Sequence, residues 1–346
     1  GGGRRLVGSL LAVAGALWAA CYAAMLALAP SDVPALVRRS SLYSCPWPEH
    51  ENAALTAARS ASRRQQRIML YQDADANYAP LLNLTHNYHS RYASRLGYTF
   101  RTAVRSKSGF PYPTLNRVWA LNEELANAQG PAGRGRRKGK HDWFVYMDAD
   151  ALVYEPRCSV EALLRNRSAS ASALLLCHDG MGDKSVLWHV NAGVFVANLR
   201  HPLLRPLACT WRRRLHWEAW RRQALATRLF RRLVLGKPPQ MWVSDQRILQ
   251  EILAEYGPRY PSLAHIVPER ECTFNLQHGT LIRHVFGARN LAAKMEAMTR
   301  VIASRGLRAL PRGGSGNGDQ NSTVLRRRDK PGRGVTTPAC LHHRHL

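Results

Sequence analysis

Five apolar residues followed directly by two aspartates constrain this chain more than any other part of its sequence. Residues 143–147 read WFVYM, and Asp148 and Asp150 come immediately after them. An unbroken apolar run of this length predicts a strand with both faces buried. In open α/β sheets, ligands bind beyond the carboxyl ends of the strands. The two acidic side chains are therefore expected where such a sheet would bind a ligand.

Two carboxylates at the end of a buried strand are costly unless a cation neutralises them. Hard divalent ions such as Mn²⁺ and Mg²⁺ prefer oxygen ligands and often bridge to the phosphates of a substrate. We therefore predict that Asp148 and Asp150 hold Mn²⁺ or Mg²⁺ against a diphosphate. The stretch by itself leaves a second interpretation open, in which the two aspartates are surface turn or helix-capping residues.

Strand-like and helix-like segments alternate along residues 66–307. The predicted strands are 68–71, 98–100, 143–147, 173–177 and 193–197. The predicted helices are 78–96, 115–125 and 202–235. Gly97 stands where a glycine ends a helix. This alternation predicts one α/β domain with a mostly parallel central sheet flanked by helices.

The N-terminal part of the chain has a different composition. Residues 6–29 contain no charged residue, and a membrane-spanning helix needs about 20 apolar residues. We predict a short cytoplasmic tail at 1–5, a signal anchor at 6–29 and a stem at 30–65, with the remainder in the lumen. A cleaved signal peptide is the rival interpretation, although its apolar core is normally about 7 to 15 residues long. Residues 308–346 are expected to form a disordered basic tail.

Charge and cysteine content add weaker constraints. The formal net charge of +27 is typical of a protein with a polyanionic partner, but an Arg-rich coding bias explains it equally well. No zinc-finger or other nucleic-acid-binding signature accompanies it, so we expect no nucleic acid partner. The 7 cysteines include no CxxC pair, and those beyond Cys21 are able to pair in an oxidising compartment. The chain opens on three glycines instead of methionine, so we expect its N-terminus to be incomplete.

A family resemblance becomes visible at residues 142–153. Their sequence, DWFVYMDADALV, resembles the strand and DxD motif of GT-A glycosyltransferases, and most of all those of the GT34 galactosyl- and xylosyltransferase family. Shorter blocks similar to those of the family follow its order over residues 67–294. These blocks are RLGY at 95–98, Arg117 before Trp119, NAG at 191–193, SDQ at 244–246, FN at 274–275 and HVFG at 284–287. The resemblance implies a GT-A fold, a UDP-sugar donor, Mn²⁺ and retention at the anomeric carbon.

The resemblance also implies roles for individual residues. His284 would join Asp148 and Asp150 as a third metal ligand, while Asp245 and Gln246 would act beside the anomeric carbon. Asp245 as a helix-capping residue remains the alternative. The expected donor-binding residues are Tyr71, Arg117, Asp148, Ala149, Asn191, Ala192, Gly193, Gly287 and Lys294.

Together these features predict a type II, single-pass Golgi membrane glycosyltransferase. It would transfer a hexose or pentose, above all galactose or xylose, from a UDP-sugar to a glycan or polysaccharide acceptor, with retention. An inverting transferase with Asp245 as the base is a second possibility. A basic protein that binds anionic polymers is a third, drawn from the net charge and the basic residues 134–140. The aromatic segment 211–222 is either an acceptor platform or part of the core.

Overall fold

The computed structural model describes residues 45–49, 66–104, 115–129, 141–165, 167–179, 188–223, 243–285 and 290–304. The predicted membrane span, the disordered tail and most of the stem lie outside these ranges. Within them, no helix is long and apolar enough to cross a bilayer.

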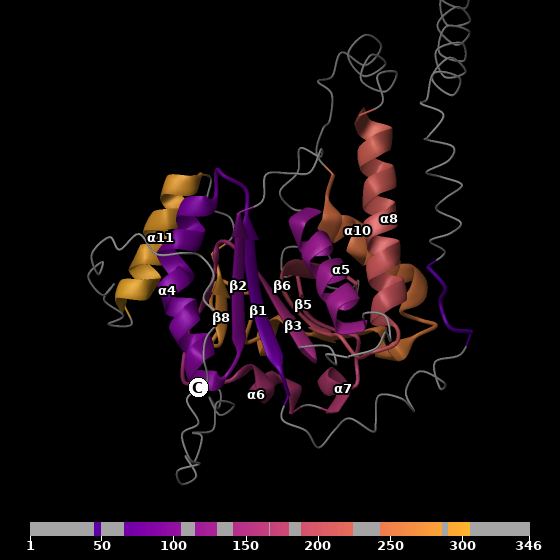
Figure 1. Ribbon diagram of the computed structural model, residues 1–346, viewed down its shortest axis with the longest axis horizontal. Helices are drawn as coiled ribbons and strands as arrows, with labels where there is room; N and C mark the ends of the chain where they lie inside the picture. The colour runs from indigo at the N-terminus through magenta and orange to yellow at the C-terminus, as the bar shows by residue number, and fades with distance from the viewer. Residues whose placement is uncertain are drawn as a thin grey trace, which may run out of the picture.

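A six-stranded sheet with the strand order β2-β1-β3-β6-β5-β7 forms the centre of the molecule (Figure 1). Its strands are β1 (Ile68–Ala74), β2 (Thr99–Val104), β3 (Trp143–Asp148), β5 (Leu174–His178), β6 (Val190–Asn198) and β7 (Ala264–Val267). The pairs β1–β2, β1–β3 and β5–β7 are parallel, whereas β6 runs antiparallel to both β3 and β5. The expectation of a mixed α/β fold with a mostly parallel central sheet is therefore confirmed.

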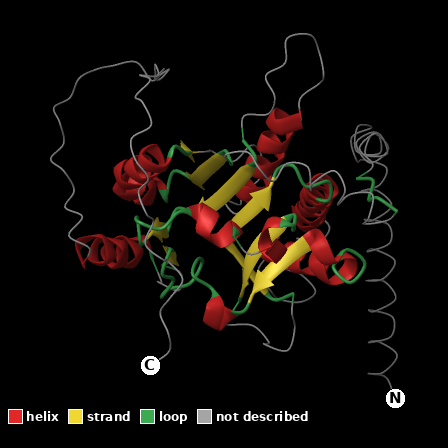
Figure 2. Cartoon of the chain, turned by 90° about the horizontal axis from the view of Figure 1, so that it is seen from below, coloured by secondary structure: helices red, strands yellow, loops and turns green. Residues whose placement is uncertain are grey.

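Helices cover both faces of this sheet (Figures 1 and 2). The longer ones are α4 (Ala79–Leu96), α5 (Asn116–Gln129), α8 (Leu204–Gln223), α10 (Asp245–Tyr256) and α11 (Leu291–Ser304). The shorter ones are α6 (Val160–Leu164), α7 (Arg167–Ser170), η2 (Pro261–Leu263) and η3 (Glu269–Glu271).

Alternate residues of β1 enter two separate hydrophobic cores, as the period of a strand requires. Met69 and Tyr71 pack into the core shared with α5, α8 and α10, while Ile68 and Leu70 pack into the core shared with α4, α6 and α7. Both faces of the sheet are thus buried. This explains the unbroken apolar runs with which β1 and β3 begin, at residues 68–71 and 143–147.

The predicted elements fall close to the observed ones. Gly97 has φ +72° and ends α4, as expected of a left-handed C-terminal glycine. The helix predicted at 202–235 is observed as α8 up to Gln223, and its remainder lies outside the described residues.

A second, two-stranded sheet lies next to the end of β3. Its strands are β4 (Ala151–Val153) and β8 (Ile282–His284), which pair antiparallel with Ala151 opposite His284. This pairing joins two segments that are far apart in the sequence and places β8 beside the two aspartates that follow β3.

Two disulfides cross-link distant parts of the described chain. Cys45 is bonded to Cys209 of α8, and Cys177 of β5 is bonded to Cys272. Next to the first disulfide, Trp47 stacks on Tyr256 with ring centroids 4.1 Å apart. The segment 45–49 is therefore attached to the α8 and α10 side of the domain.

Candidate metal centre

Asp148, Asp150 and His284 come together at the carboxyl end of β3. His284 Nε2 lies 3.1 Å from Asp150 Oδ1 and 3.7 Å from Asp148 Oδ2. One ligand atom from each residue lies within 4.8 Å of the other two. The three residues assigned to a metal from the sequence therefore form one cluster, although His284 is 134 positions from Asp150.

The donor set and its spacing fit a divalent cation. An ion with ligands at about 2.1 Å in octahedral geometry has neighbouring ligand atoms about 3 Å apart, close to the distances observed here. Two carboxylates and one imidazole suit Mn²⁺, and carboxylates alone would suit Mg²⁺. The three residues form a candidate divalent-metal site.

Gly193 of β6 makes the room that this cluster needs. A Cβ at this position would lie 2.0 Å from His284 Cε1 and 2.9 Å from Asp148 Oδ2, and real Cβ atoms do not approach other atoms so closely. The sequence placed Gly193 beside the donor sugar. The structure packs its backbone against two of the candidate ligands.

Two cationic side chains contact the acids of the centre. Arg117 of α5 lies 3.1 Å from Asp148 Oδ1. Its Nε lies 2.8 Å from Asp245 Oδ2, an ion pair that lacks hydrogen-bond geometry. Lys294 of α11 forms an ion pair with Asp150. Both cations were expected to meet the donor, and in the structure both lie on the acids that would hold the metal.

The centre carries more negative than positive charge. Four carboxylates and two permanent cations meet around it; all are buried except Asp148 and Lys294, which are half-buried. The six groups are Asp73, Asp148, Asp150, Asp245, Arg117 and Lys294. With all six ionised and the His284 ring neutral, an excess of two negative charges remains, which one divalent cation would neutralise.

The pKa values of the acids show this imbalance. Burial raises the pKa of Asp245 to about 6, although the charge of Arg117 opposes the shift. Burial also raises the pKa of Asp148. For Asp150 burial acts in the same direction, but its contacts with His284 and Lys294 outweigh it, so its pKa lies below the usual range.

Gln246 is held in place by hydrogen bonds at both ends of its side-chain amide. Its Oε1 accepts from Ala192 N at 3.1 Å, and its Nε2 donates to Asp179 Oδ2 at 3.1 Å. Asn191 Oδ1 accepts from Gly193 N at 2.8 Å. These hydrogen bonds join the segment 191–193 to the first turn of α10. Both were predicted to act beside the donor sugar, which requires them to lie close together.

Ser244, and not Asp245, caps α10. The Ser244 side chain accepts a hydrogen bond from Arg247 N, so the capping alternative for Asp245 is wrong. Asp245 follows as the first helical residue and is 3% exposed. Its side chain points to Arg117 and the interior of the site.

A buried polar network braces the turn that carries the two aspartates. Gln72 Nε2 donates to the carbonyls of Asp148 and Ala151, each at 3.0 Å. His89 Nε2 accepts from Val153 N at 3.2 Å, and His89 Nδ1 donates to Gln72 Oε1 at 2.8 Å. Burial, followed by the charge of His86, lowers the pKa of His89 to about 3. Sequence reasoning missed this network, because an isolated Gln and His carry no local signal of their partners.

The remaining predicted site residues are Tyr71, Ala149 and Gly287. Tyr71 is 2% exposed and lies in the core with its ring over Tyr146, at a centroid distance of 6.3 Å. Ala149, in the turn between the two aspartates, is also buried. Gly287 lies outside the described residues. Direct contact of Tyr71 and Ala149 with a donor stays a prediction.

The aromatic segment of α8 divides between core and surface. Trp211 is fully buried and donates a 2.9 Å hydrogen bond to the carbonyl of Asp245, so this residue belongs to the core. Trp217 is 54% exposed. The two rings do not share one face, which weighs against a single acceptor platform on α8.

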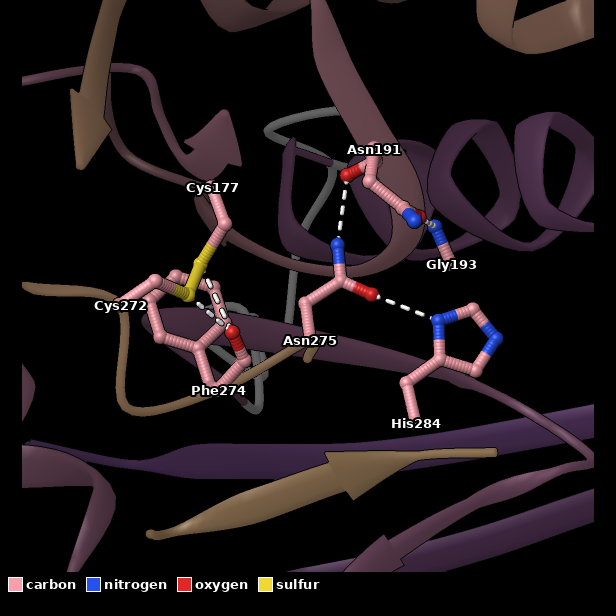
Figure 3. The surroundings of a disulfide bond; sticks show 7 residues. All are labelled: Cys177, Asn191, Gly193, Cys272, Phe274, Asn275 and His284. Atoms are coloured by element: carbon pink, nitrogen blue, oxygen red, sulfur yellow. Dashed lines mark hydrogen bonds between the residues drawn. A yellow bond between two sulfur atoms is a disulfide. The ribbon is translucent and has the colours of Figure 1, made fainter. Parts of the chain in front are cut away.

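Asn275 links His284 to β6. Its Nδ2 donates to Asn191 O at 2.7 Å, and its Oδ1 lies 2.8 Å from His284 Nδ1 (Figure 3). The sequence pointed to Asn275 only as part of a motif, without a role. Nothing in its local sequence indicates this bridge, because both partners are distant along the chain.

Comparisons with known proteins identify no family. No protein-family model and no curated protein matches the chain. Among solved structures, a glycosyltransferase involved in glycosylation of the major capsid of PBCV-1 is 16% identical, with a TM-score of 0.42, over 68% of this chain and 99% of the other. A Drosophila β-1,4-galactosyltransferase 7 mutant, in complex with manganese, UDP-Gal and xylobiose, is 10% identical, with a TM-score of 0.33, over 64% of this chain and 71% of the other. At such identities and scores the function has to be argued from the site.

Proposed function

We propose that the protein is a metal-dependent glycosyltransferase of the GT-A type that uses a UDP-sugar. One observation carries the proposal: the two acids at the carboxyl end of β3 and the distant His284 converge in a buried cluster with an excess of negative charge. When bound there, a divalent cation would stabilise the negative charge that develops on a departing diphosphate.

Residues of the chain itself have matching tasks in this proposal. Asp148, Asp150 and His284 would hold the metal, and Gly193 leaves space for the side chains of His284 and Asp148. Lys294 is the more accessible of the two cations, with 16% of its side chain exposed against 7% for Arg117. Lys294 is therefore the one placed to meet a phosphate, while Arg117 keeps the carboxylates of the site in position.

The setting of Asp245 favours retention over inversion. A general base must come within hydrogen-bond reach of the acceptor hydroxyl, and Asp245 is buried with its Oδ2 beside Arg117. In a retaining reaction the leaving phosphate would accept the proton of the acceptor, so this route needs no base from the protein. Gln246, fixed between Ala192 and Asp179, is then positioned to orient the sugar.

The finer parts of the proposal rest mainly on the sequence. We propose membership of the GT34 family, galactose or xylose as the transferred sugar, and a glycan or polysaccharide acceptor. We also propose a type II Golgi membrane protein with a lumenal catalytic domain, anchored by residues 6–29. The two disulfides support an oxidising compartment, because such bonds are rare in the cytosol.

Donor hydrolysis by the full chain tests this function. A panel of UDP-sugars is assayed with and without Mn²⁺, for the unmodified protein, Asp150→Ala and the control Glu251→Ala. Glu251 is an exposed carboxylate of α10 that forms an i,i+4 ion pair with Arg247. We expect metal-dependent turnover that Asp150→Ala abolishes and Glu251→Ala preserves. Turnover without metal, or binding of RNA without any turnover, would refute the proposal.

A further inference from the structure

The side chain of Asn275 stands between the candidate metal ligand His284 and the backbone of β6 (Figure 3). It is fully buried, and its φ of +67° is the left-handed conformation that Asn adopts more readily than most residues. Its two amide atoms each have one close partner, so the orientation of the amide is determined by what those partners can donate or accept.

The hydrogen-bond chemistry allows only one arrangement. The partner of Asn275 Nδ2 is the carbonyl oxygen of Asn191 at 2.7 Å, which can only accept. The amide NH₂ must therefore face Asn191, and the amide oxygen must face His284. An amide oxygen also only accepts, so the His284 Nδ1 at 2.8 Å must carry a proton.

When the ring is neutral, its other nitrogen is then the unprotonated one. In a neutral imidazole with the proton on Nδ1, Nε2 carries no proton. This Nε2 is the atom that lies 3.1 Å from Asp150 Oδ1 and 3.7 Å from Asp148 Oδ2. Without Asn275 the ring would gain by placing its proton on Nε2 and donating it to Asp150, which would block the site for a cation.

We propose that Asn275 is a positioning residue that fixes the Nδ1–H tautomer of His284 and so keeps Nε2 available to a metal. The inference deepens the proposed function and rests on it for the identity of the ligand, but the tautomer itself is a property of the metal-free protein. Partners of this kind, which orient a metal-binding histidine through its second nitrogen, commonly change metal affinity by about 10- to 100-fold.

The backbone on both sides of Asn275 is held in place by bonds to other segments. Three residues before it, Cys272 is bonded to Cys177 of β5. The Phe274 carbonyl lies 2.7 Å from Cys177 Sγ, a contact and not a hydrogen bond, since a disulfide sulfur has no proton. After it, His284 N donates to the carbonyl of Leu276 at 3.0 Å. The amide therefore has little freedom to turn away from the imidazole.

The tautomer can be measured directly in the metal-free full chain. The protein is labelled with ¹⁵N in its histidine rings, and the His284 signals are identified from their loss in His284→Gln. The spectrum is recorded on the alkaline side of the ring's own titration. We expect a protonated Nδ1 and a bare Nε2. A proton on Nε2 would overturn the proposal, whether or not the protein binds metal.

Variants test the consequence for metal binding. Asn275→Gly removes the side chain that carries the amide and keeps a residue that tolerates positive φ. We expect Mn²⁺ binding, followed by calorimetry, to weaken by about 10- to 100-fold, and the ring proton to move toward Nε2. The control is Asn198→Ala at the opposite end of β6, where the side chain bonds the backbone of Ser170 and Arg200.

The outcomes separate this inference from the proposed function. Unchanged tautomer and Mn²⁺ affinity in a folded Asn275→Gly would overturn the inference while leaving the metal centre intact. A protein with the Nδ1–H tautomer that binds no Mn²⁺ would overturn the proposed function and support the assignment of the tautomer. Should Asn275→Gly fail to fold, the spectrum of the unmodified chain still decides the tautomer.

Discussion

Replacement of Gly193 by alanine should damage the metal centre through one added carbon atom. The Cβ of Gly193→Ala would lie 2.0 Å from His284 Cε1, 2.6 Å from His284 Nδ1 and 2.9 Å from Asp148 Oδ2. Carbon atoms in contact are normally about 3.5 Å apart or more. Either the imidazole or the backbone of β6 must therefore move by about 1.5 Å.

The backbone of β6 has little room to move. The strand is buried along its whole length and pairs with β3 on one side and β5 on the other. The shift thus falls mainly on His284, which must move away from Gly193. Metal sites tolerate ligand displacements of about 0.2 Å, so we expect the imidazole ligand to be lost. A decrease in Mn²⁺ affinity of about 100-fold or more follows, equivalent to about 2.7 kcal/mol.

Calorimetric titration of the full chain with Mn²⁺ measures this effect, and thermal unfolding measures stability separately. The added methyl group should also cost about 1–3 kcal/mol of stability through overpacking. Gly97→Ala is the matched control. Gly97 has φ +72°, but a Cβ there meets nothing within 4 Å, so this variant should lose stability and keep its Mn²⁺ affinity. A folded Gly193→Ala that binds Mn²⁺ like the unmodified protein would refute the reasoning.

Two further predictions concern buried charge. Folding lowers the pKa of His89 from 6.5 to about 3, so between these pH values the unfolded chain binds a proton at this ring and the folded chain does not. The contribution of His89 to stability is therefore complete above pH 6.5. Below pH 6.5 the free energy of unfolding falls by about 1.4 kcal/mol per pH unit. Urea unfolding between pH 6 and pH 4 should show this decrease, and His89→Gln should flatten it; equal slopes for both proteins would contradict the assignment. Arg117→Met leaves Asp148 and Asp245 without their shared cation, so we expect a loss of about 3–5 kcal/mol without metal. Mn²⁺ should reduce that loss in thermal unfolding, and a loss that Mn²⁺ does not change would contradict the charge balance inferred for the site.

The sequence predicted the parts of the fold that depend on local pattern. The apolar run before Asp148 identified β3, and helical spacing with Gly97 identified α4, because strand burial and helix termination leave signals within a few residues. The direction of β6 could not be predicted from such local signals. A strand buried on both faces has an apolar sequence whether it runs parallel or antiparallel to its neighbours. β6 is antiparallel to both of its neighbours.

The candidate metal ligands were identified because a motif singled them out, whereas no motif indicated which residues would contact them. The approach of His284 to Asp150 depends on the pairing of β4 with β8, which no local pattern reports. The contacts of Arg117 with Asp148, and of Lys294 with Asp150, depend on how α5 and α11 pack. Such long-range contacts follow from tertiary packing, so the sequence assigned these two cations to a donor instead of to the acids.

The central claim is that one divalent cation binds Asp148, Asp150 and His284 together. Pulsed electron paramagnetic resonance of Mn²⁺ bound to the full chain tests it most directly, because the method detects nitrogen bonded to the ion. We predict one imidazole nitrogen coupling that disappears in His284→Gln, together with much weaker Mn²⁺ binding in Asp150→Asn. Bound Mn²⁺ without a nitrogen coupling, or with a coupling unchanged in His284→Gln, would contradict the account.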